Sequence, residues 1–370
     1  MRASPIALVG FFCLPCVTAA HHSVSAQFDR DHTVEIEGEV TRVNWQNPHV
    51  RFTVSVADED GEATLWVIES TSVSTLRRMD ISAELVVVGD RVRIAGNLSR
   101  TQPREIYVNN LLLPDGQEVV MTARAAPRWS EQTLGTTGPG FVTSGGVSDP
   151  SRGLFRVWST PFSVPILFPE NVDFDFDFER YPLTAAARAS LAAWDQATDN
   201  PTLNCAAKGM PTIMEQPFPM EFVDTGGVIL LRLEEYDLIR MIHMNSGATT
   251  AEEAATPLGV STGRWEGRAL VVSTDRINWP HFDTVGIPLS EAARLVERFT
   301  PSVDGDRLDY ELTVTDPATF TQPVTLAKRW VWIPGVEVGV YACVVSGSME
   351  RAVHSEDTVG VIRTGIDRTS

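Results

Sequence analysis

The chain has 370 residues, 43% of them hydrophobic and 21% charged, which is the composition of a folded protein rather than a disordered one. Its 30 Lys and Arg against 48 Asp and Glu give a net charge of −18. Nucleic acids and anionic membrane surfaces are bound mainly through Lys and Arg, so this charge argues against both as partners. At roughly 100–200 residues per domain, the length favours two domains.

The first residues have the features of an export signal. Arg2 is followed by an apolar run over residues 6–17 and by the small residues 18–20, which would make His21 the first mature residue. The run is shorter than the roughly 20 apolar residues that span a bilayer. We therefore expect residues 1–20 to be a signal peptide and the mature protein to be soluble and periplasmic or secreted, without an integral membrane segment. The alternative is a buried N-terminal helix.

Residues 33–122 alternate apolar and polar side chains, as half-buried antiparallel strands do. A short helix is expected over residues 72–79, between the third and fourth strands. About five strands with a helix at that point are typical of a small OB-like barrel. We assign this barrel to residues 21–125.

A linker is expected over residues 126–200, because Gly, Pro and Ser cluster there. Leu183, Ala187, Leu191 and Trp194 recur at helical spacing, with Thr184 placed to cap the first turn. The linker should therefore contain one amphipathic helix.

Residues 201–370 return to strands separated by tight turns. The expected strands are 220–223, 228–235, 238–244, 259–266, 269–276, 295–300, 308–315, 324–333 and 338–345. A long antiparallel meander usually closes on itself to remove its edges. The prediction is a larger, lipocalin-like up-and-down β-barrel, wide enough to hold one small ligand.

Cys205 and Cys343 are the cysteines that remain after signal cleavage. In an oxidising compartment such a pair is expected to form a disulfide, and the alternative is two buried thiols.

Several short motifs are spread along the mature chain. They are His21-His22-Ser23, Asn47-Pro48-His49, Asn204-Cys205, Gly209-Met210-Pro211 and Gly263-Arg264-Trp265-Glu266-Gly267. In this combination the chain resembles an uncharacterised family of exported bacterial two-domain β proteins. The resemblance implies a bacterial envelope protein and brings no established activity with it.

The histidines His21, His22 and His49 form a possible metal site. After cleavage, His21 would offer an imidazole and the α-amino group, and nitrogen donors of this kind suit Cu(II). His22 or His49 would supply a further nitrogen. The other interpretation is a frayed terminus, with His49 at the end of a strand.

A second group of polar side chains belongs to the larger barrel. Glu235 ends one expected strand, Arg240 and His243 lie on the next, and Asp283 lies in a loop at the barrel mouth. Strand parity places His243 with the apolar Ile239 and Met241, which would turn it into the barrel. An acid, an arginine and a histidine in a water-poor interior could move protons. The alternative is a belt of paired charges outside the barrel.

The sequence contains no Gly-x-Ser-x-Gly, phosphate-loop, dinucleotide or His-Glu-x-x-His signature. The leading hypothesis is an exported protein that binds a small, largely apolar molecule in its C-terminal barrel. Its chemistry, if it is an enzyme, would be cofactor-free proton transfer of the lyase or isomerase type: hydration, isomerisation or cyclisation. Two alternatives stay open, a non-enzymatic periplasmic copper-binding or carrier protein and a structural accessory of the envelope.

Overall fold

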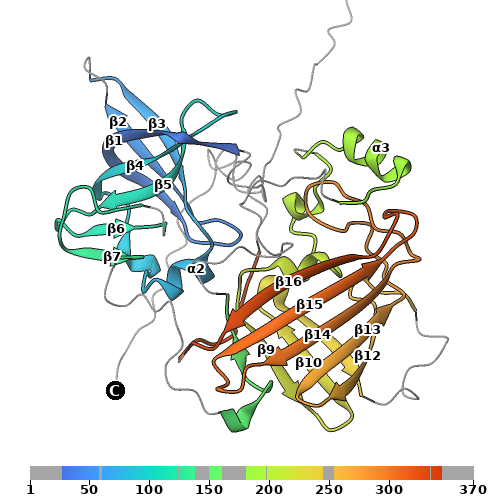
Figure 1. The fold of residues 1–370 in the computed structure, drawn as a ribbon. Helices are drawn as coiled ribbons and strands as arrows, with labels where there is room; N and C mark the ends of the chain where they lie inside the picture. Colours follow the sequence, from blue (N-terminus) through green and yellow to red (C-terminus); the bar gives the residue numbers. More distant parts are fainter. Residues whose placement is uncertain are drawn as a thin grey trace, which may run out of the picture.

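The computed structural model describes residues 27–57, 61–122, 125–137, 150–160, 181–196, 198–244, 254–333 and 335–343. These residues form a mainly β structure with two sheets, each curled into a barrel, which lie side by side (Figure 1). The expected signal peptide and His21 and His22 lie outside the described residues.

The smaller barrel is built from the N-terminal sheet. Its strands are β1 (Phe28–Asn44), β2 (Arg51–Ala57), β3 (Ala63–Glu69), β4 (Arg91–Ser99), β5 (Glu105–Leu112), β6 (Glu118–Val120) and β7 (Thr133–Gly135). They are ordered β3-β2-β1-β4-β5-β6-β7, and β3 also pairs in parallel with β5, which closes the first five strands into a barrel. The helix α2 (Val73–Arg78) connects β3 to β4. This is the OB-like arrangement that the sequence predicts.

Local sequence explains where α2 begins. The Ser72 side chain accepts a hydrogen bond from the backbone N–H of Thr75, the usual role of an N-cap serine. Above the helix, alternate residues of the strands fill the barrel, with Phe52 and Val54 buried on β2. The period-two pattern thus packs one face of each strand inward.

The larger barrel is built from the C-terminal sheet. Its strands are β8 (Val157–Trp158), β9 (Met220–Asp224), β10 (Val228–Leu233), β11 (Leu238–His243), β12 (Val260–Glu266), β13 (Ala269–Asp275), β14 (Arg294–Pro301), β15 (Arg307–Thr315) and β16 (Val324–Val331). They follow one another in chain order, and a two-hydrogen-bond bridge between Ser159 and Val331 nearly closes the sheet. All pairs are antiparallel except β11 and β12, which run in parallel.

One expected strand is wrong. Within the described residues, 335–343 form no strand of the barrel, and β8 supplies the ninth strand instead. The physical reason is that backbone N–H groups of this segment donate to carboxylates: Gly339 to Glu234, and Tyr341 to Asp237. We call residues 335–343 the strap.

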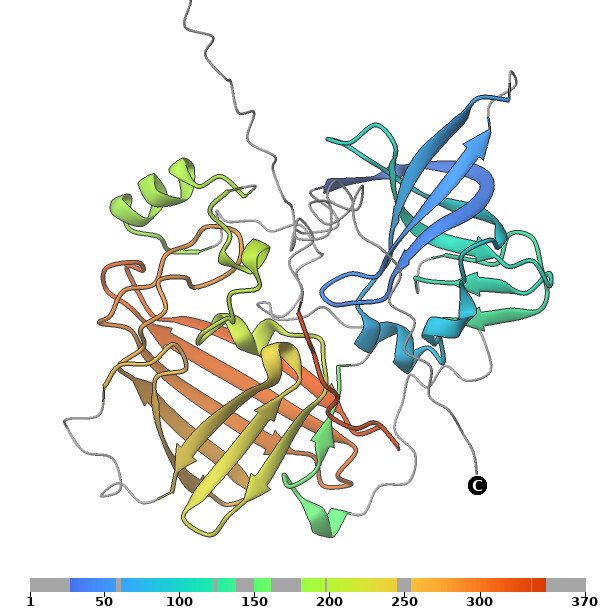
Figure 2. The same ribbon diagram turned by 180° about the vertical axis from the view of Figure 1, so that it is seen from behind.

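Short helices gather near one end of the larger barrel. The expected amphipathic helix is α3 (Ala185–Ala193), and Thr184 caps it by accepting from the N–H of Ala187. Between α3 and β9 come the 3-10 turns η4 (Pro201–Asn204) and η5 (Thr212–Glu215), yellow-green in Figure 2.

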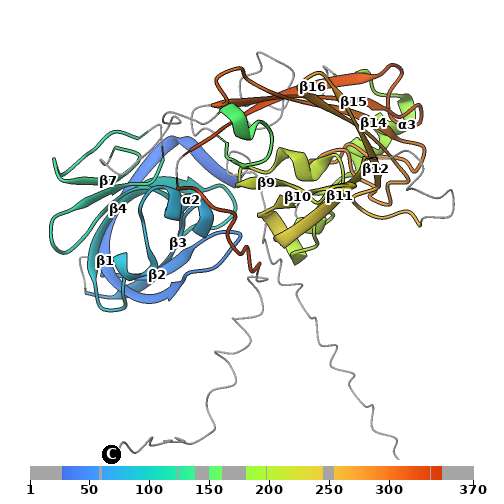
Figure 3. The ribbon, with the colours of Figure 1, turned by 90° about the horizontal axis from the view of Figure 1, so that it is seen from below.

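The two barrels contact each other through α2 and the strap. Seen from below, the strap, in red, runs between the barrels (Figure 3). The expected disulfide between Cys205 and Cys343 is confirmed, with Cα atoms 5.9 Å apart, and it fixes the end of the strap. Among the described residues, no helix is long and apolar enough to cross a membrane.

Candidate functional site

Five ionisable side chains converge at one end of the larger barrel, around η5. They are Lys208, Glu215, Glu235, Asp283 and Lys328, and we call them the charged cluster. Glu235 and Asp283 are two of the four residues predicted as catalytic. The other members come from the segment before η5, from η5 itself and from β16, so the cluster joins residues more than a hundred positions apart in the chain.

The pair Lys208–Glu235 is the buried ion pair of the cluster. The Lys208 Nζ lies 2.8 Å from the Glu235 Oε1, and both side chains are nearly inaccessible to solvent. Glu235 lies beyond the end of β10, in the 3-10 turn η6 (Glu235–Asp237). A charge buried with its partner is retained, whereas a lone one would be costly.

Lys328 projects inward from β16 and ties that strand to η5. Its Nζ donates to the carbonyl oxygens of Met214, Glu215 and Gln216 at 3.1, 3.3 and 2.8 Å. It also lies 4.7 Å from the centre of the Trp330 ring. Burial lowers the pKa of Lys328 to about 7, although the neighbouring acids oppose this shift.

Two acids of the cluster have raised pKa values. Burial and the negative charge of Asp283 raise the pKa of Glu215 to about 8. Burial raises the pKa of Asp283 to about 6, against the stabilising N–H groups of Val285, Gly286 and Ile287. Both carboxyls therefore titrate near neutral pH, which is where a general acid or base is useful.

Aromatic side chains surround the acids. Tyr181 contacts Phe282, and the half-buried His281 lies between the rings of Trp194 and Trp279, with ring centres 5.5 and 4.9 Å away. The loop is fixed to η5 because the Trp279 Nε1 donates to the Thr212 Oγ1 at 2.8 Å. The predicted mouth loop thus lies beside Glu215, with largely apolar walls.

Two buried carboxylate and amide atoms in this region have no hydrogen-bond partner among the described residues. They are the Oε2 of Glu235 and the Nε2 of Gln216, whose residues are 1% and 0% exposed. A buried polar group without a partner costs about 1–3 kcal/mol, so such atoms commonly mark the place of a water, ion or ligand.

Arg240 belongs to a separate network in the middle of the barrel. Its guanidinium forms a two-pronged ion pair with Glu297 and donates to the hydroxyls of Ser261 and Thr274, while the Tyr310 hydroxyl donates to Glu297. These five residues come one each from β11, β12, β13, β14 and β15. The network is fully buried and mutually satisfied, so it links strands rather than presenting a reactive group.

The expected inward orientation of His243 is wrong. Ile239 and Met241, which share its face of β11, are 56% and 57% exposed, whereas Arg240 and Ile242 are buried. The buried pair with Glu297 takes Arg240 inward, and the period of two then turns His243 outward. His243 is half-buried at the end of the strand, away from the charged cluster.

His49 lies on the smaller barrel, just before β2. Its Nδ1 is 3.0 Å from the Ser70 carbonyl oxygen, so it donates there, and 3.4 Å from the Glu69 carboxylate. Across the described ranges, no three His, Cys, Asp or Glu side chains are grouped as metal ligands. His21 and His22, the other proposed copper ligands, fall outside those ranges.

Sequence reasoning missed Lys208, Glu215 and Lys328. Lys328 carried a usable signal, because it falls between Leu326 and Trp330 on the alternating face of an expected strand. Lys208 and Glu215 lie in irregular segments, where no repeating pattern of apolar residues indicates which side chains point inward.

A family of unknown function (DUF6152) matches residues 10–105, which include part of the expected export signal and most of the smaller barrel. Comparison with curated proteins found no match. The chain is thus similar, over its first quarter or so, to an uncharacterised family.

Proposed function

We propose that the protein binds a small, largely apolar molecule at the charged cluster of its larger barrel and carries out acid–base chemistry on it. The observation that carries the proposal is the convergence of five ionisable side chains at one end of the larger barrel, next to its apolar core. The unpartnered Glu235 Oε2 accepts a donor group of the ligand, and the aromatic residues around His281 contact its apolar part.

Glu215 is the proton donor in this proposal and Asp283 is its partner. With its raised pKa, Glu215 holds a proton at neutral pH and can give it to a bound group, and the more acidic Asp283 stabilises the charge that results elsewhere in the site. This corresponds to hydration, isomerisation or cyclisation without a cofactor. We propose, from the sequence, that this takes place in the bacterial periplasm or outside the cell.

Binding can be tested with intact protein purified from its native compartment. Native mass spectrometry should detect a co-purified small molecule, and the fluorescent apolar amine N-phenyl-1-naphthylamine should bind saturably. Glu235→Gln should weaken that binding by about tenfold, the loss of one charge-assisted hydrogen bond. The matched control is Glu311→Gln, an exposed carboxyl on β15, which should bind like the original protein. Absence of both a bound mass and saturable dye binding contradicts the proposal.

A further inference from the structure

The two cysteines of the disulfide lie in chain segments that are connected to the two members of the buried Lys208–Glu235 pair. On one side, Cys205 follows η4 and lies three residues before Lys208. On the other side, Cys343 ends the strap, whose backbone contacts the turn that contains Glu235. One covalent bond therefore joins the segment that leads to Lys208 to the strap, which in turn hydrogen-bonds to the turn that contains Glu235.

The strap grips the turn on both sides of Glu235. The N–H of Gly339 donates to the Glu234 Oε2 at 2.7 Å, and the N–H of Tyr341 donates to the Asp237 Oδ1 at 2.9 Å. The buried Tyr341 ring packs against the ring of Tyr236, with centres 5.1 Å apart. These contacts fix the residues on both sides of Glu235 and so hold Glu235 in position.

The turn itself is strained. Tyr236 and Asp237 are consecutive non-glycine residues with φ of 60° and 53°. A left-handed conformation is unfavourable for a residue with a side chain, so it persists where surrounding contacts enforce it. The Asp237 carboxylate, which accepts from the strap, is one of those contacts.

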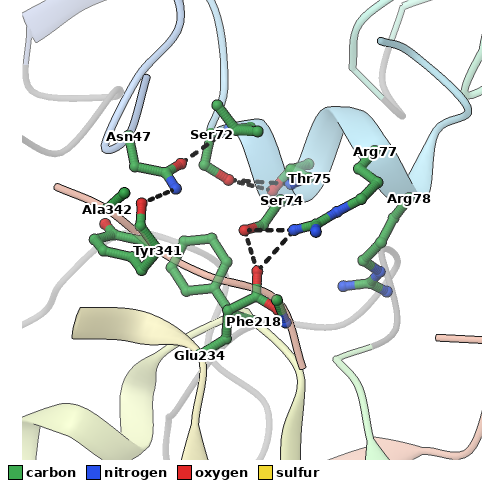
Figure 4. Close-up of polar contacts among 12 residues, drawn as sticks. Asn47, Ser72, Ser74, Thr75, Arg77, Arg78, Phe218, Glu234, Tyr341 and Ala342 are labelled. Carbon is green, nitrogen blue, oxygen red and sulfur yellow. Dashed lines mark hydrogen bonds and ion pairs between the residues drawn. The ribbon is translucent and has the colours of Figure 1, made fainter. Parts of the chain in front are cut away.

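The same strap also contacts the smaller barrel. The Asn47 side chain donates to the Tyr341 carbonyl oxygen and accepts from the Val73 N–H, which joins the strap to α2 (Figure 4). Glu234 accepts from Ser74 and Arg77 of α2 as well as from the strap. The strap therefore stands between the smaller barrel and the charged cluster.

We propose that the Cys205–Cys343 disulfide is a redox-sensitive device that controls the geometry of the charged cluster. Both cysteines are half-buried and thus within reach of a small dithiol. The dithiol reduces the bond: its two sulfurs form a new disulfide, and Cys205 and Cys343 each take up a proton as thiols. The released strap no longer holds the 234–237 turn, which relaxes and separates Glu235 from Lys208. The regulatory role rests on the proposed function, whereas the structural change does not.

Hydrogen exchange on the full chain, followed by mass spectrometry with and without dithiothreitol, tests this. Reduction should accelerate exchange in the strap and in residues 234–237 by about tenfold or more, while β13–β15 stay protected. Cys205→Ser/Cys343→Ser should resemble the reduced protein and not respond to dithiothreitol. Asp237→Ala, with the disulfide intact, should reproduce the faster exchange of the turn.

Two results overturn the proposal. Unchanged exchange in the strap and turn on reduction shows that the disulfide does not hold them. Faster exchange throughout the barrel shows that it is a general staple rather than a local device. Binding of N-phenyl-1-naphthylamine is measured in both redox states. If the dye binds in neither state, the proposed function fails, while the exchange data still decide the proposal about the strap.

Discussion

Glu215 and Asp283 show how the surroundings of single residues set the chemistry of the charged cluster. Both carboxyls have raised pKa values, about 8 and about 6, because burial disfavours the charged form. The pKa of Asp283 is raised less because three backbone N–H groups stabilise its negative charge. Lys328 is shifted the opposite way, to about 7, because the same burial disfavours its ammonium.

The raised pKa of Glu215 predicts a pH-dependent stability. Between its ordinary value of 4.5 and about 8, the native state keeps a proton that the unfolded chain has lost, so this residue lowers the free energy of unfolding as pH rises. Glu215→Gln removes the titration. In urea unfolding, the free energy of unfolding of the variant should therefore increase relative to that of the original protein from pH 4.5 to 8. With Glu311→Gln as the control, a pH-independent difference for both variants contradicts the assignment.

At the scale of elements, the Arg240 network connects five consecutive strands through one polar residue each. Interaction with the buried Glu297 keeps the pKa of Arg240 raised despite its own burial. Removing one partner would leave an uncompensated charge in the barrel, which is the costly way to break a buried pair. The network therefore stabilises the register of β11 to β15.

Arg240→Met should lower the free energy of unfolding by about 3–5 kcal/mol, because Glu297 would remain buried without its cation. The matched control is Arg232→Met on the neighbouring strand, whose pair with Glu221 is partly exposed. Exposed pairs contribute about 0–1 kcal/mol. Urea unfolding at neutral pH distinguishes the two, and equal costs would show that the Arg240 network is not a buried ion pair in solution.

The packing of η5 against the mouth loop predicts a strict requirement at Gly209. A Cβ there would lie 2.4 Å from the Pro257 oxygen and 2.5 Å from Trp279. Gly209→Ala should therefore cost about 1–3 kcal/mol, as overpacking does. Gly227→Ala, where a Cβ meets nothing within 4 Å, is the control. Thermal unfolding measures both, and an unchanged melting temperature for Gly209→Ala would mean that the loop does not pack as described.

At the scale of the whole molecule, α2 is one of the parts of the smaller barrel that contact the larger barrel. Arg78 donates to the Thr160 carbonyl oxygen at 2.6 Å and to that of Pro217 at 3.4 Å. Burial lowers its pKa to about 10, which leaves it charged at neutral pH. Ser74 and Arg77 contact Glu234 on the adjacent face (Figure 4).

Arg78→Ala should loosen the contact between the barrels without unfolding either one, because it removes hydrogen bonds that join them. Small-angle scattering should show a larger radius of gyration, with an unchanged circular dichroism spectrum. Arg91→Ala, which removes an exposed arginine paired with Glu37 on the smaller barrel, is the control. A compact Arg78→Ala protein would show that the other contacts are sufficient.

Local patterns predicted most elements of this protein, but neither β8 nor the path of the strap. The period of two predicts both barrels, Ser72 and Thr184 lie at the start of helices that they cap, and the remaining cysteine pair predicts the disulfide. Most of these features depend on neighbours in the chain. They can therefore be predicted from composition, from the spacing of apolar residues and from the residues found at turns and helix ends.

Only the tertiary structure decided which polar residues meet. The alternating pattern of β11 shows that its two faces differ, but it does not show which face points into the barrel. Arg240 points inward because its buried partner, Glu297, lies on another strand, and His243 therefore points outward. The charged cluster depends in the same way on contacts between a turn, a loop and β16. The strap does not form the strand that the sequence predicts, because its backbone N–H groups donate to carboxylates of another segment. Long-range partners of this kind leave no period in the sequence, so their outcome is set by folding as a whole.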